Sequence, residues 1–252
     1  MNNKILVVCG PTAVGKSAFA LSLAEKLNIE IISADAIQVY KALNIGTAKP
    51  SKQELTSVPH HMIDIISPLE EFNVALFTAK VKEIIRQIWV RNALPVIVGG
   101  TGFYIEGLLN NYSFDNIDGR RQEMNKTSLD VTIVCLNKER AQLYAEIDSR
   151  VDQMMEKGLL DEVKVLRSIG AGEGAQSMQA IGYKEFVPYL NNEISLATAI
   201  ANVKQNSRNY AKRQLTWFRG MQGIRWINMP EERVQALQSL ITEFDEYKKT
   251  TP

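Results

Sequence analysis

Residues 10–17 are Gly10-Pro11-Thr12-Ala13-Val14-Gly15-Lys16-Ser17. This stretch fits G-x-x-x-x-G-K-[ST], the pattern of loops that wrap around phosphate groups. The apolar run at residues 5–9 predicts a buried strand before it, and apolar residues at helical spacing in residues 18–27 predict a helix after it. In that arrangement the backbone N–H groups of the loop point at an anion beside the helix N-terminus. An ordinary tight turn before a helix is the competing interpretation, and the flanking strand and helix disfavour it.

The last two residues of this loop carry its charge and its metal chemistry. Lys16 supplies a positive charge for the terminal phosphate, and the Ser17 hydroxyl is a candidate ligand for Mg²⁺. Most loops of this kind bind ATP or GTP, which would make the protein a kinase or a nucleoside triphosphatase. The loop alone does not say which phosphate compound it holds, so other residues have to decide.

Strands and helices alternate along the rest of the chain. We expect strands at residues 30–34, 62–65, 95–98, 131–136 and 226–227, and helices at residues 74–90, 101–109, 139–157, 159–169, 183–190, 195–219 and 231–247. This order predicts an α/β fold, a parallel sheet flanked by helices as in phosphate-loop nucleoside triphosphatases, with a helical C-terminal part. Ligands of such sheets bind at the carboxyl ends of the strands. Asp35 and Thr101 each follow a predicted strand, so we expect both to meet the phosphate loop in one crevice.

Three polar side chains have both a structural and a functional interpretation. Asp35 is either the N-cap of a helix or a base or Mg²⁺ ligand, and its place beside the phosphate loop favours the functional role. Thr101 is either the N-cap of the helix that starts at Gly102 or a hydroxyl aimed into the crevice. Arg150, four residues after Glu146, is either half of a surface ion pair or a clamp on a phosphate group. The spacing by itself favours the ion pair.

The net charge of +1 hides a basic segment near the C-terminal end. Residues 194–230 contain no Asp or Glu, and Lys204, Arg208 and Lys212 recur every four residues on one helical face. Exposed helices normally interleave both signs of charge, so this stripe predicts a site for a polyanion. Trp217 and Phe218 follow the stripe, and we expect both to be core residues.

The remaining composition narrows the class of protein and its location. Cys9 and Cys135, the only cysteines, lie beside apolar runs and predict reduced core residues of a cytosolic protein. His60 and His61, the only histidines, predict a turn rather than a metal site. We expect no signal peptide before the first strand and find no apolar run long enough to cross a bilayer. These features predict a cytoplasmic protein with no membrane partner.

Several segments taken together resemble one family, the tRNA dimethylallyltransferases. Besides residues 10–17, they are Ile31-Ile32-Ser33-Ala34-Asp35-Ala36-Ile37-Gln38-Val39-Tyr40, Ile45-Gly46-Thr47-Ala48-Lys49-Pro50, Pro59-His60-His61-Met62-Ile63-Asp64-Ile65, Val98-Gly99-Gly100-Thr101-Gly102-Phe103-Tyr104, Ile181-Gly182-Tyr183 and Ala211-Lys212-Arg213-Gln214-Leu215-Thr216-Trp217-Phe218-Arg219. The resemblance covers nearly the whole chain outside residues 110–130, and the ordered set of motifs is specific.

The resemblance implies a reaction and a role for each candidate residue. Members transfer the dimethylallyl group of dimethylallyl diphosphate to N6 of adenine 37, beside the tRNA anticodon, with Mg²⁺ as cofactor. In this chain residues 10–17 would hold the diphosphate, with Ser17 on the metal and Arg150 also on pyrophosphate. The catalytic residues would be Lys16, Thr101, Arg150 and Asp35, the last as general base. The tRNA-binding residues would be Asp35, Ala36, Ile37, Gln38, Thr101, Lys204, Arg208, Lys212 and Arg213.

One region departs from the family pattern. Typical members carry a longer helical insertion after the Gly-Gly-Thr segment, which grips the anticodon stem-loop, whereas only residues 110–130 fill that place here. We expect a phosphate-loop core at residues 1–109, a shortened insertion or lid at 110–130 with Gly119-Arg120-Arg121 as its basic spot, and the rest of the core with the C-terminal helices at 131–252.

Two alternatives stay open at this point. The reduced insertion allows a free adenine nucleotide as the acceptor of the same group, and a phosphate-loop kinase of a small molecule is the alternative from another class. The basic stripe favours tRNA over a free nucleotide, because tRNA is a polyanion. We expect the protein to act as a monomer.

Overall fold

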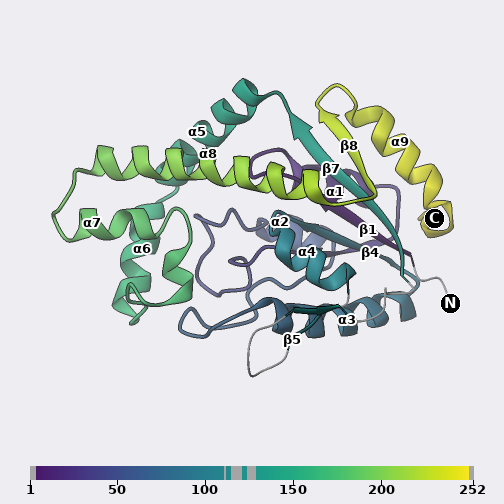
Figure 1. Ribbon diagram of the computed structural model, residues 1–252, viewed down its shortest axis with the longest axis horizontal. Coiled ribbons are helices and arrows are strands. Elements are labelled where there is room, and N and C mark those ends of the chain that lie inside the picture. The colour runs from purple at the N-terminus through teal and green to yellow at the C-terminus, as the bar shows by residue number, and fades with distance from the viewer. Residues whose placement is uncertain (1–3, 111, 115–120, 124–128, 250–252) are drawn as a thin grey trace.

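A computed structural model gives the fold and describes residues 4–110, 112–114, 121–123 and 129–249. Six strands form one parallel sheet in the order β3-β2-β4-β1-β7-β8 (Figure 1). They are β1 (Lys4–Cys9), β2 (Ile29–Ser33), β3 (His60–His61), β4 (Leu94–Gly99), β7 (Asp130–Lys138) and β8 (Ile224–Met229). The predicted α/β fold is confirmed, and the phosphate loop follows β1 in the middle of the sheet.

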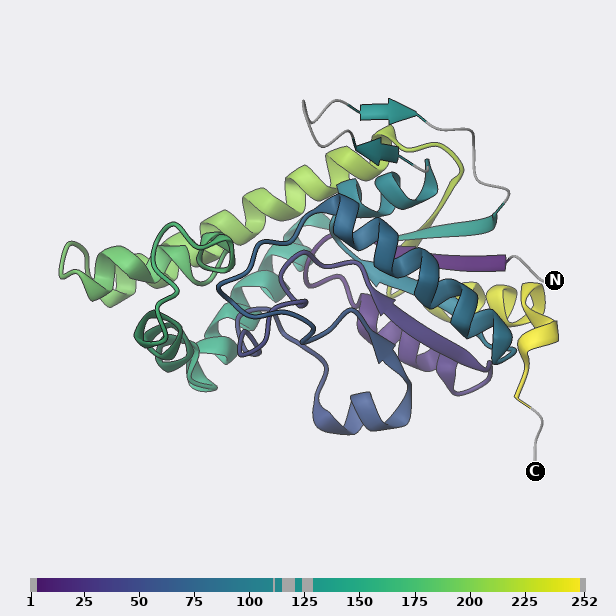
Figure 2. The ribbon, with the colours of Figure 1, turned by 90° about the horizontal axis from the view of Figure 1, so that it is seen from below.

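Helices cover both faces of the sheet (Figure 2). One face packs against α1 (Lys16–Ala24) and α9 (Arg233–Glu243), and the other packs against α3 (Val74–Val90) and α4 (Gly102–Leu109). Two long helices, α5 (Arg140–Glu156) and α8 (Leu196–Gly220), contribute side chains to both cores. Both faces of each central strand are buried, which explains why these strands are continuous apolar runs.

The remaining helical elements are short or lie away from the sheet. They are α2 (Lys52–Ser57), α6 (Leu159–Ser168), α7 (Val187–Leu190) and the 3₁₀ turns Gln176–Gln179, Lys184–Phe186 and Asp245–Tyr247. Helix α2 begins with a capping box, in which Ser51 accepts from the Glu54 N–H and the Glu54 carboxylate accepts from the Ser51 N–H. The chain reaches α2 from residues 44–50, a segment that borders the site described below.

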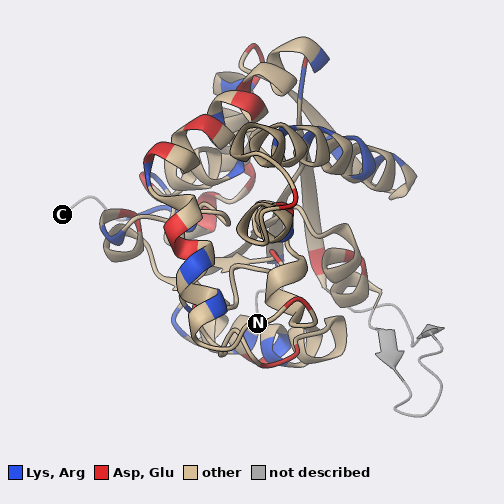
Figure 3. Cartoon of the chain, turned by 90° about the vertical axis from the view of Figure 1, so that its left-hand side faces the viewer, with Lys and Arg blue, Asp and Glu red and all other residues tan. Residues whose placement is uncertain are grey.

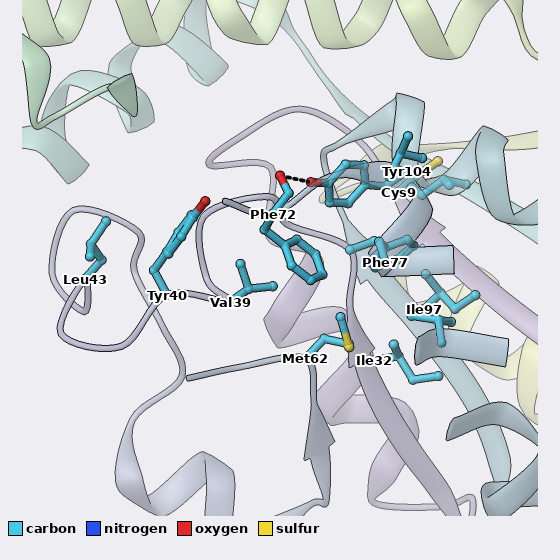
Figure 4. Packing of buried hydrophobic residues seen from close by; sticks show 14 of the residues in the cluster. Cys9, Ile32, Val39, Tyr40, Leu43, Met62, Phe72, Phe77, Ile97 and Tyr104 are labelled. Carbon is cyan, nitrogen blue, oxygen red and sulfur yellow. Dashed lines mark hydrogen bonds between the residues drawn. The ribbon is translucent and has the colours of Figure 1, made fainter. Parts of the chain in front are cut away.

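Aromatic packing fixes the start of α4, the helix that follows Gly100. Phe77 of α3 stacks on Tyr104 with ring centroids 4.7 Å apart. The Tyr104 hydroxyl donates to the Phe72 carbonyl oxygen at 3.5 Å (Figure 4). Cys9 is a free, buried residue of this core, as the sequence predicts, and it pairs in register with Cys135 of β7, which is also free and buried.

Some predicted boundaries are wrong. The third strand is not at residues 62–65, because Met62 and Asp64 have φ values of 65° and 55° and turn the chain. The strand consists instead of His60 and His61, where a turn is predicted. Strand β8 is longer than predicted because it pairs with β7 at six positions. The last helix is shorter than predicted and ends at Glu243.

Residues of the two predicted core segments, 1–109 and 131–252, share one sheet. Strand β7 pairs with β1 on the side opposite β4, and β8 extends the sheet from there. Between the segments, β5 (Tyr112–Phe114) and β6 (Arg121–Glu123) form an antiparallel hairpin where a loop or lid is predicted. Gly119 and Arg120 of the predicted basic spot lie outside the described residues. Within the described part of the chain, no helix has the length and apolar character needed to cross a membrane.

Candidate active site

Two adjoining cavities lie at the carboxyl ends of the central strands. The first, of about 410 Å³, is lined by the phosphate loop, and we call it the loop cavity. The second, of about 360 Å³, is lined in part by apolar side chains of α5 and α8, and we call it the helix cavity. Five residues line both cavities, and they are Thr12, Asp35, Thr47, Arg150 and Tyr210. The cavities therefore share a boundary, at which a group held in one can meet a group held in the other.

The phosphate loop has the backbone that its glycines predict. Gly10 and Gly15 have φ values of 141° and 98°, a region that favours glycine. A Cβ on Gly10 would lie 2.6 Å from the Leu136 carbonyl oxygen, so this position also needs glycine for its close approach to β7. Gly15 is the N-cap of α1, which starts at Lys16. The first N–H groups of α1 have no partner within the helix and are available to an anion in the loop cavity.

The Lys16 side chain folds back onto its own loop. Nζ donates to the carbonyl oxygens of Gly10 at 3.0 Å and Pro11 at 2.7 Å. Burial and the nearby positive charge of Arg150 lower the pKa of Lys16 to about 8, while the Asp35 carboxylate opposes the shift. An anion bound by the loop would add the negative charge that favours the protonated amine.

Asp35 follows β2 and lines both cavities. Its Oδ1 accepts from the N–H groups of Ile37 at 2.9 Å and Gln38 at 3.3 Å. Residues 36–39 form a turn, so Asp35 is not the N-cap of a helix. Both bonds use Oδ1, which leaves Oδ2 for a group bound at the boundary of the two cavities.

Thr101 occupies the N-cap position of α4 but makes no side-chain bond that caps the helix. Its Oγ1 accepts instead from the Ala36 N–H at 3.1 Å. It also lies near the Tyr210 phenol and opposes the rise in the pKa of that group. The hydroxyl thus ties the start of α4 to the residue after Asp35, and it lines the helix cavity, as the functional interpretation predicts.

Arg150 of α5 lines both cavities and does not form the predicted surface pair. Glu146, the expected partner, binds Lys138 instead. Burial lowers the pKa of the Arg150 guanidinium, and the Asp35 charge opposes this shift. No side chain in the described part of the chain forms a hydrogen bond or ion pair with Arg150. A half-buried guanidinium at the boundary of two cavities is suited to binding a phosphate group.

One loop of the cavity wall is held by a residue that the sequence analysis missed. The Glu162 carboxylate of α6 accepts from the N–H groups of Asn44 at 2.8 Å, Ile45 at 2.9 Å and Gly46 at 3.1 Å, and from the Tyr183 hydroxyl at 2.7 Å. A Cβ on Gly46 would lie 2.6 Å from the Tyr183 ring. The three residues whose N–H groups bind Glu162 are 116 to 118 positions away from it, so no local sequence pattern predicts this contact.

Two residues of α8, Tyr210 and Gln214, also line the loop cavity and were missed. Burial, together with the Asp35 charge, raises the pKa of the Tyr210 phenol to about 12, so the phenol keeps its proton. The two residues are four positions apart and share one face of the helix. That spacing, beside the motif at residues 211–219, is the signal that could have pointed to them.

The basic stripe on α8 has acidic partners after all, and they come from α5. Lys204 donates to Asp152 at 2.8 Å, and Arg208 Nη1 donates to both carboxylate oxygens of Asp148 at 2.5 and 2.7 Å. The argument from missing partners is therefore wrong for these two cations. Lys212 is exposed and has no ion pair within the described part of the chain. In Figure 3, α8 is the long helix that carries blue bands and no red one.

Arg213 and Trp217 place the end of α8 near the same site. Arg213 lines the helix cavity, and its guanidinium lies 5.7 Å from the Tyr210 ring centroid. Trp217, predicted to be a core residue, is 41% exposed, whereas Phe218 is buried as predicted. A Cβ on Gly102 would lie 2.3 Å from Trp217 Cδ1, so the indole covers the start of α4.

A divalent metal in the loop cavity would need ligands from the bound substrate as well as from the protein. Ser17 lines the loop cavity next to Lys16, with Asp35 on another wall. No group of three acidic, His or Cys side chains in the described residues could hold a metal by itself. Mg²⁺ commonly takes one or two protein oxygens and completes its shell with phosphate oxygens and water. The Ser17 hydroxyl beside a phosphate-binding loop fits that pattern.

Comparison with known proteins identifies relatives along most of the chain. Residues 38–131 and 116–221 match the family described as "IPPT: IPP transferase". The tRNA dimethylallyltransferases of Anoxybacillus flavithermus and Bacillus licheniformis are 37% and 38% identical, and the matches cover 93% and 94% of this chain and 93% and 95% of those proteins. The first alignment spans 290 positions, more than the 252 residues of this chain, so that relative holds residues that this chain lacks.

Solved structures agree with these matches. The full-length tRNA isopentenylpyrophosphate transferase of Bacillus halodurans superposes with a TM-score of 0.87 at 34% identity, with 98% of each chain covered. A eukaryotic dimethylallyltransferase described as acting on tRNA superposes with a TM-score of 0.86 at 25% identity, with 100% of this chain and 81% of that chain covered. These relatives are prenyltransferases, so the kinase alternative loses its support. The chain therefore belongs to the IPP transferase family, the tRNA dimethylallyltransferases.

Proposed function

We propose that this protein transfers the dimethylallyl group of dimethylallyl diphosphate to N6 of adenine 37, beside the anticodon of a tRNA, and releases pyrophosphate. The observation that carries the proposal is the shared boundary of two unlike cavities at Asp35 and Arg150. One cavity contains a phosphate loop with a half-buried lysine, and the other has an apolar wall. A substrate with a diphosphate at one end and a short isoprenoid at the other fits across that boundary.

The loop cavity stabilises the leaving group. As the bond between the allylic carbon and the diphosphate oxygen breaks, negative charge grows on the diphosphate. Lys16, the N–H groups at the start of α1 and the Arg150 guanidinium are already placed around the cavity that would hold this charge. Mg²⁺, when bound by Ser17 and the diphosphate oxygens, neutralises a further part of it.

Asp35 accounts for the proton of the reaction. The adenine N6 forms a bond to the allylic carbon, and the electron pair of the broken carbon–oxygen bond leaves with pyrophosphate. N6 must then lose one of its hydrogens, and the free Oδ2 of Asp35 accepts it as general base. Thr101 and Tyr210 line the same cavity and can hold the base in place. The adenine has to leave its stack in the anticodon loop to enter the cavity.

The proposed tRNA contacts fall into two groups. Asp35, Ala36, Ile37 and Gln38 form the turn after β2, and the first three of them line the helix cavity. On α8, Lys212 is exposed and Arg213 reaches the helix cavity, so these two cations are the better placed for RNA phosphates. Lys204 and Arg208 would first have to exchange Asp152 and Asp148 for phosphate groups.

A free adenine nucleotide is the second candidate acceptor. The observation in its favour is that the Anoxybacillus relative holds residues that this chain lacks. Lys212 of α8 favours tRNA, because it is exposed and lines neither cavity, so a nucleotide inside a cavity would not use it. A tRNA substrate supports the cytoplasmic location.

The test is transfer of label from dimethylallyl diphosphate that is labelled in its allyl group. The protein is incubated with Mg²⁺ and either unmodified tRNA carrying adenine 37, the same tRNA with guanine at that position, or AMP. We expect label only in the tRNA with adenine 37. Label in AMP but not in tRNA would show that the acceptor is a free nucleotide, and label in no acceptor would overturn the proposal.

A further inference from the structure

The Gln214 side chain joins two loops that are far apart in the sequence. Its Oε1 accepts from the Thr12 N–H of the phosphate loop at 2.8 Å. Its Nε2 donates to the Gly100 carbonyl oxygen, in the turn between β4 and α4, at 2.9 Å. Thr12 and Gly100 lie 202 and 114 positions away along the chain. The residue is only 5% exposed, so both bonds are formed away from bulk water.

The local structure is shaped around this amide. A Cβ on Gly100 would lie 2.2 Å from Gln214 Nε2, so a larger residue at this position would push the amide out of its place. The Thr12 N–H donates to Gln214 and is not available to an anion. The N–H groups that cradle an anion are therefore those later in the loop. A side-chain amide is the group that fits here, because it offers one acceptor and one donor from the same planar end.

The amide also continues into a chain of polar groups that ends beside Asp35. The Tyr210 phenol lies near both Gln214 and Thr101, and each of them opposes the rise in its pKa. Thr101 in turn accepts from the N–H of Ala36, the residue after Asp35. Neighbouring polar groups thus run from the phosphate loop to the residue after Asp35, with hydrogen bonds at the two ends, between Gln214 and Thr12 and between Thr101 and Ala36.

We propose that Gln214 is a positioning residue, which holds the phosphate loop in register with Asp35 and Thr101. The inference rests on the proposed prenyl transfer, in which nucleophile, allylic carbon and leaving oxygen must lie in line. Displacing one reacting group by about 1 Å can cost about 100-fold in rate. Gln214 lines the loop cavity, but both of its polar atoms are bonded to the protein, so its loss should act on turnover more than on diphosphate binding.

Two substitutions separate the two bonds. Gln214→Met keeps the size of the side chain and removes both bonds. Gln214→Glu keeps the acceptor for Thr12 but can donate to the Gly100 carbonyl only when its carboxyl group is protonated. Lowering the pH should therefore restore the second bond in Gln214→Glu and leave Gln214→Met unchanged. Gln87→Met is the matched control, because Gln87 is an exposed residue of α3.

The experiment measures kcat for prenyl transfer to tRNA and, separately, the Kd for dimethylallyl diphosphate. We expect Gln214→Met to lower kcat by about 10- to 100-fold while Kd changes by less than about threefold. The ratio of Gln214→Glu to wild-type kcat should rise as the pH falls, and the same ratio for Gln214→Met should stay flat. Gln87→Met should match wild type.

Three results would overturn the proposal. They are a kcat of Gln214→Met within about threefold of wild type, an equal loss in kcat and in diphosphate affinity, and a Gln214→Glu ratio that does not respond to pH. If Gln214→Met does not fold, the Gln214→Glu profile decides alone. A wild-type protein that transfers label to no acceptor would contradict the proposed function instead, so the two failures are distinguishable.

Discussion

The two cavities differ in how the chain builds them. Most of the loop cavity's chemistry comes from eight consecutive residues, 10–17, together with the helix that they start. The helix cavity takes its walls from α5, α8, the turn after β2 and the loop at residues 179–184, none of which are neighbours in sequence. The leaving-group side of the proposed reaction is thus a local motif, whereas the acceptor side exists only after the chain has folded.

This contrast predicts that changes in the two cavities affect different steps. Residues of the loop cavity should govern diphosphate affinity and departure. Residues of the helix cavity and its rim should govern the acceptor. Asp35 and Arg150, on the boundary, should affect the chemical step itself.

Asp35→Asn is the change from which we expect the largest effect. The amide keeps an acceptor for the turn N–H groups but cannot take the N6 proton, so kcat should fall by about 10²- to 10⁴-fold. The Kd for dimethylallyl diphosphate should stay within about threefold of wild type, because a base lost from the boundary does not loosen the phosphate loop. Single-turnover transfer to tRNA measures the first quantity, and calorimetry measures the second. Asp161→Asn on α6, whose partner is Lys164, is the control. A near-normal kcat would reduce Asp35 to a structural turn residue.

Lys16→Met should come next. It removes one preorganised charge from the leaving group, so kcat should fall by about 10²- to 10³-fold, and the affinity for diphosphate should weaken as well. The affinity for tRNA should stay unchanged, because Lys16 does not line the helix cavity. Filter binding to tRNA without the diphosphate measures that control. Equal losses in both affinities would contradict the division between the two cavities.

The pH dependence of diphosphate binding should reveal the same lysine. Below pH 8 Lys16 is protonated in the free protein and attracts the diphosphate, and above about pH 8 the free amine is neutral. The Kd should therefore be constant below that pH and rise above it by up to about tenfold per pH unit, as expected for one linked proton. In Lys16→Arg the guanidinium stays charged, so the rise should disappear. A profile that is identical in both proteins would assign the dependence to another group.

The smallest effect should appear at an exposed cation of α8, Lys212. Lys212→Gln should weaken tRNA binding and reduce the slope of log K against log salt by about 0.7 to 0.9, the contribution of one phosphate contact. Lys204→Gln should leave the slope unchanged, because Lys204 is paired with Asp152. Binding measured at four or more salt concentrations gives both slopes. If Lys204→Gln lowers the slope as much as Lys212→Gln does, the ion pair between Lys204 and Asp152 breaks when tRNA binds.

The sequence was sufficient to predict the positions of those site residues that depend only on local geometry. The glycines of the phosphate loop predict its φ values, and the position of Asp35 and Thr101 after strands predicts that they meet the loop. The failures have a physical cause as well. Met62 and Asp64 lie in an apolar run that suggests a strand, but left-handed backbone at both positions turns the chain. The prediction that the cations of α8 lack acidic partners considered only the residues of that helix. The partners of Lys204 and Arg208 lie on α5.

The phosphate loop, the parallel sheet and the family can be predicted from the residues alone, because these depend on short-range spacing and on which residues end a strand. The packing of the folded chain is what places Arg150 at the cavities, pairs Arg208 with Asp148 and lets Gln214 bridge Thr12 and Gly100. Each of these contacts depends on how α5 and α8 pack against the carboxyl ends of the strands. A hydrogen bond between residues 202 positions apart is fixed by that packing, and no local pattern encodes it.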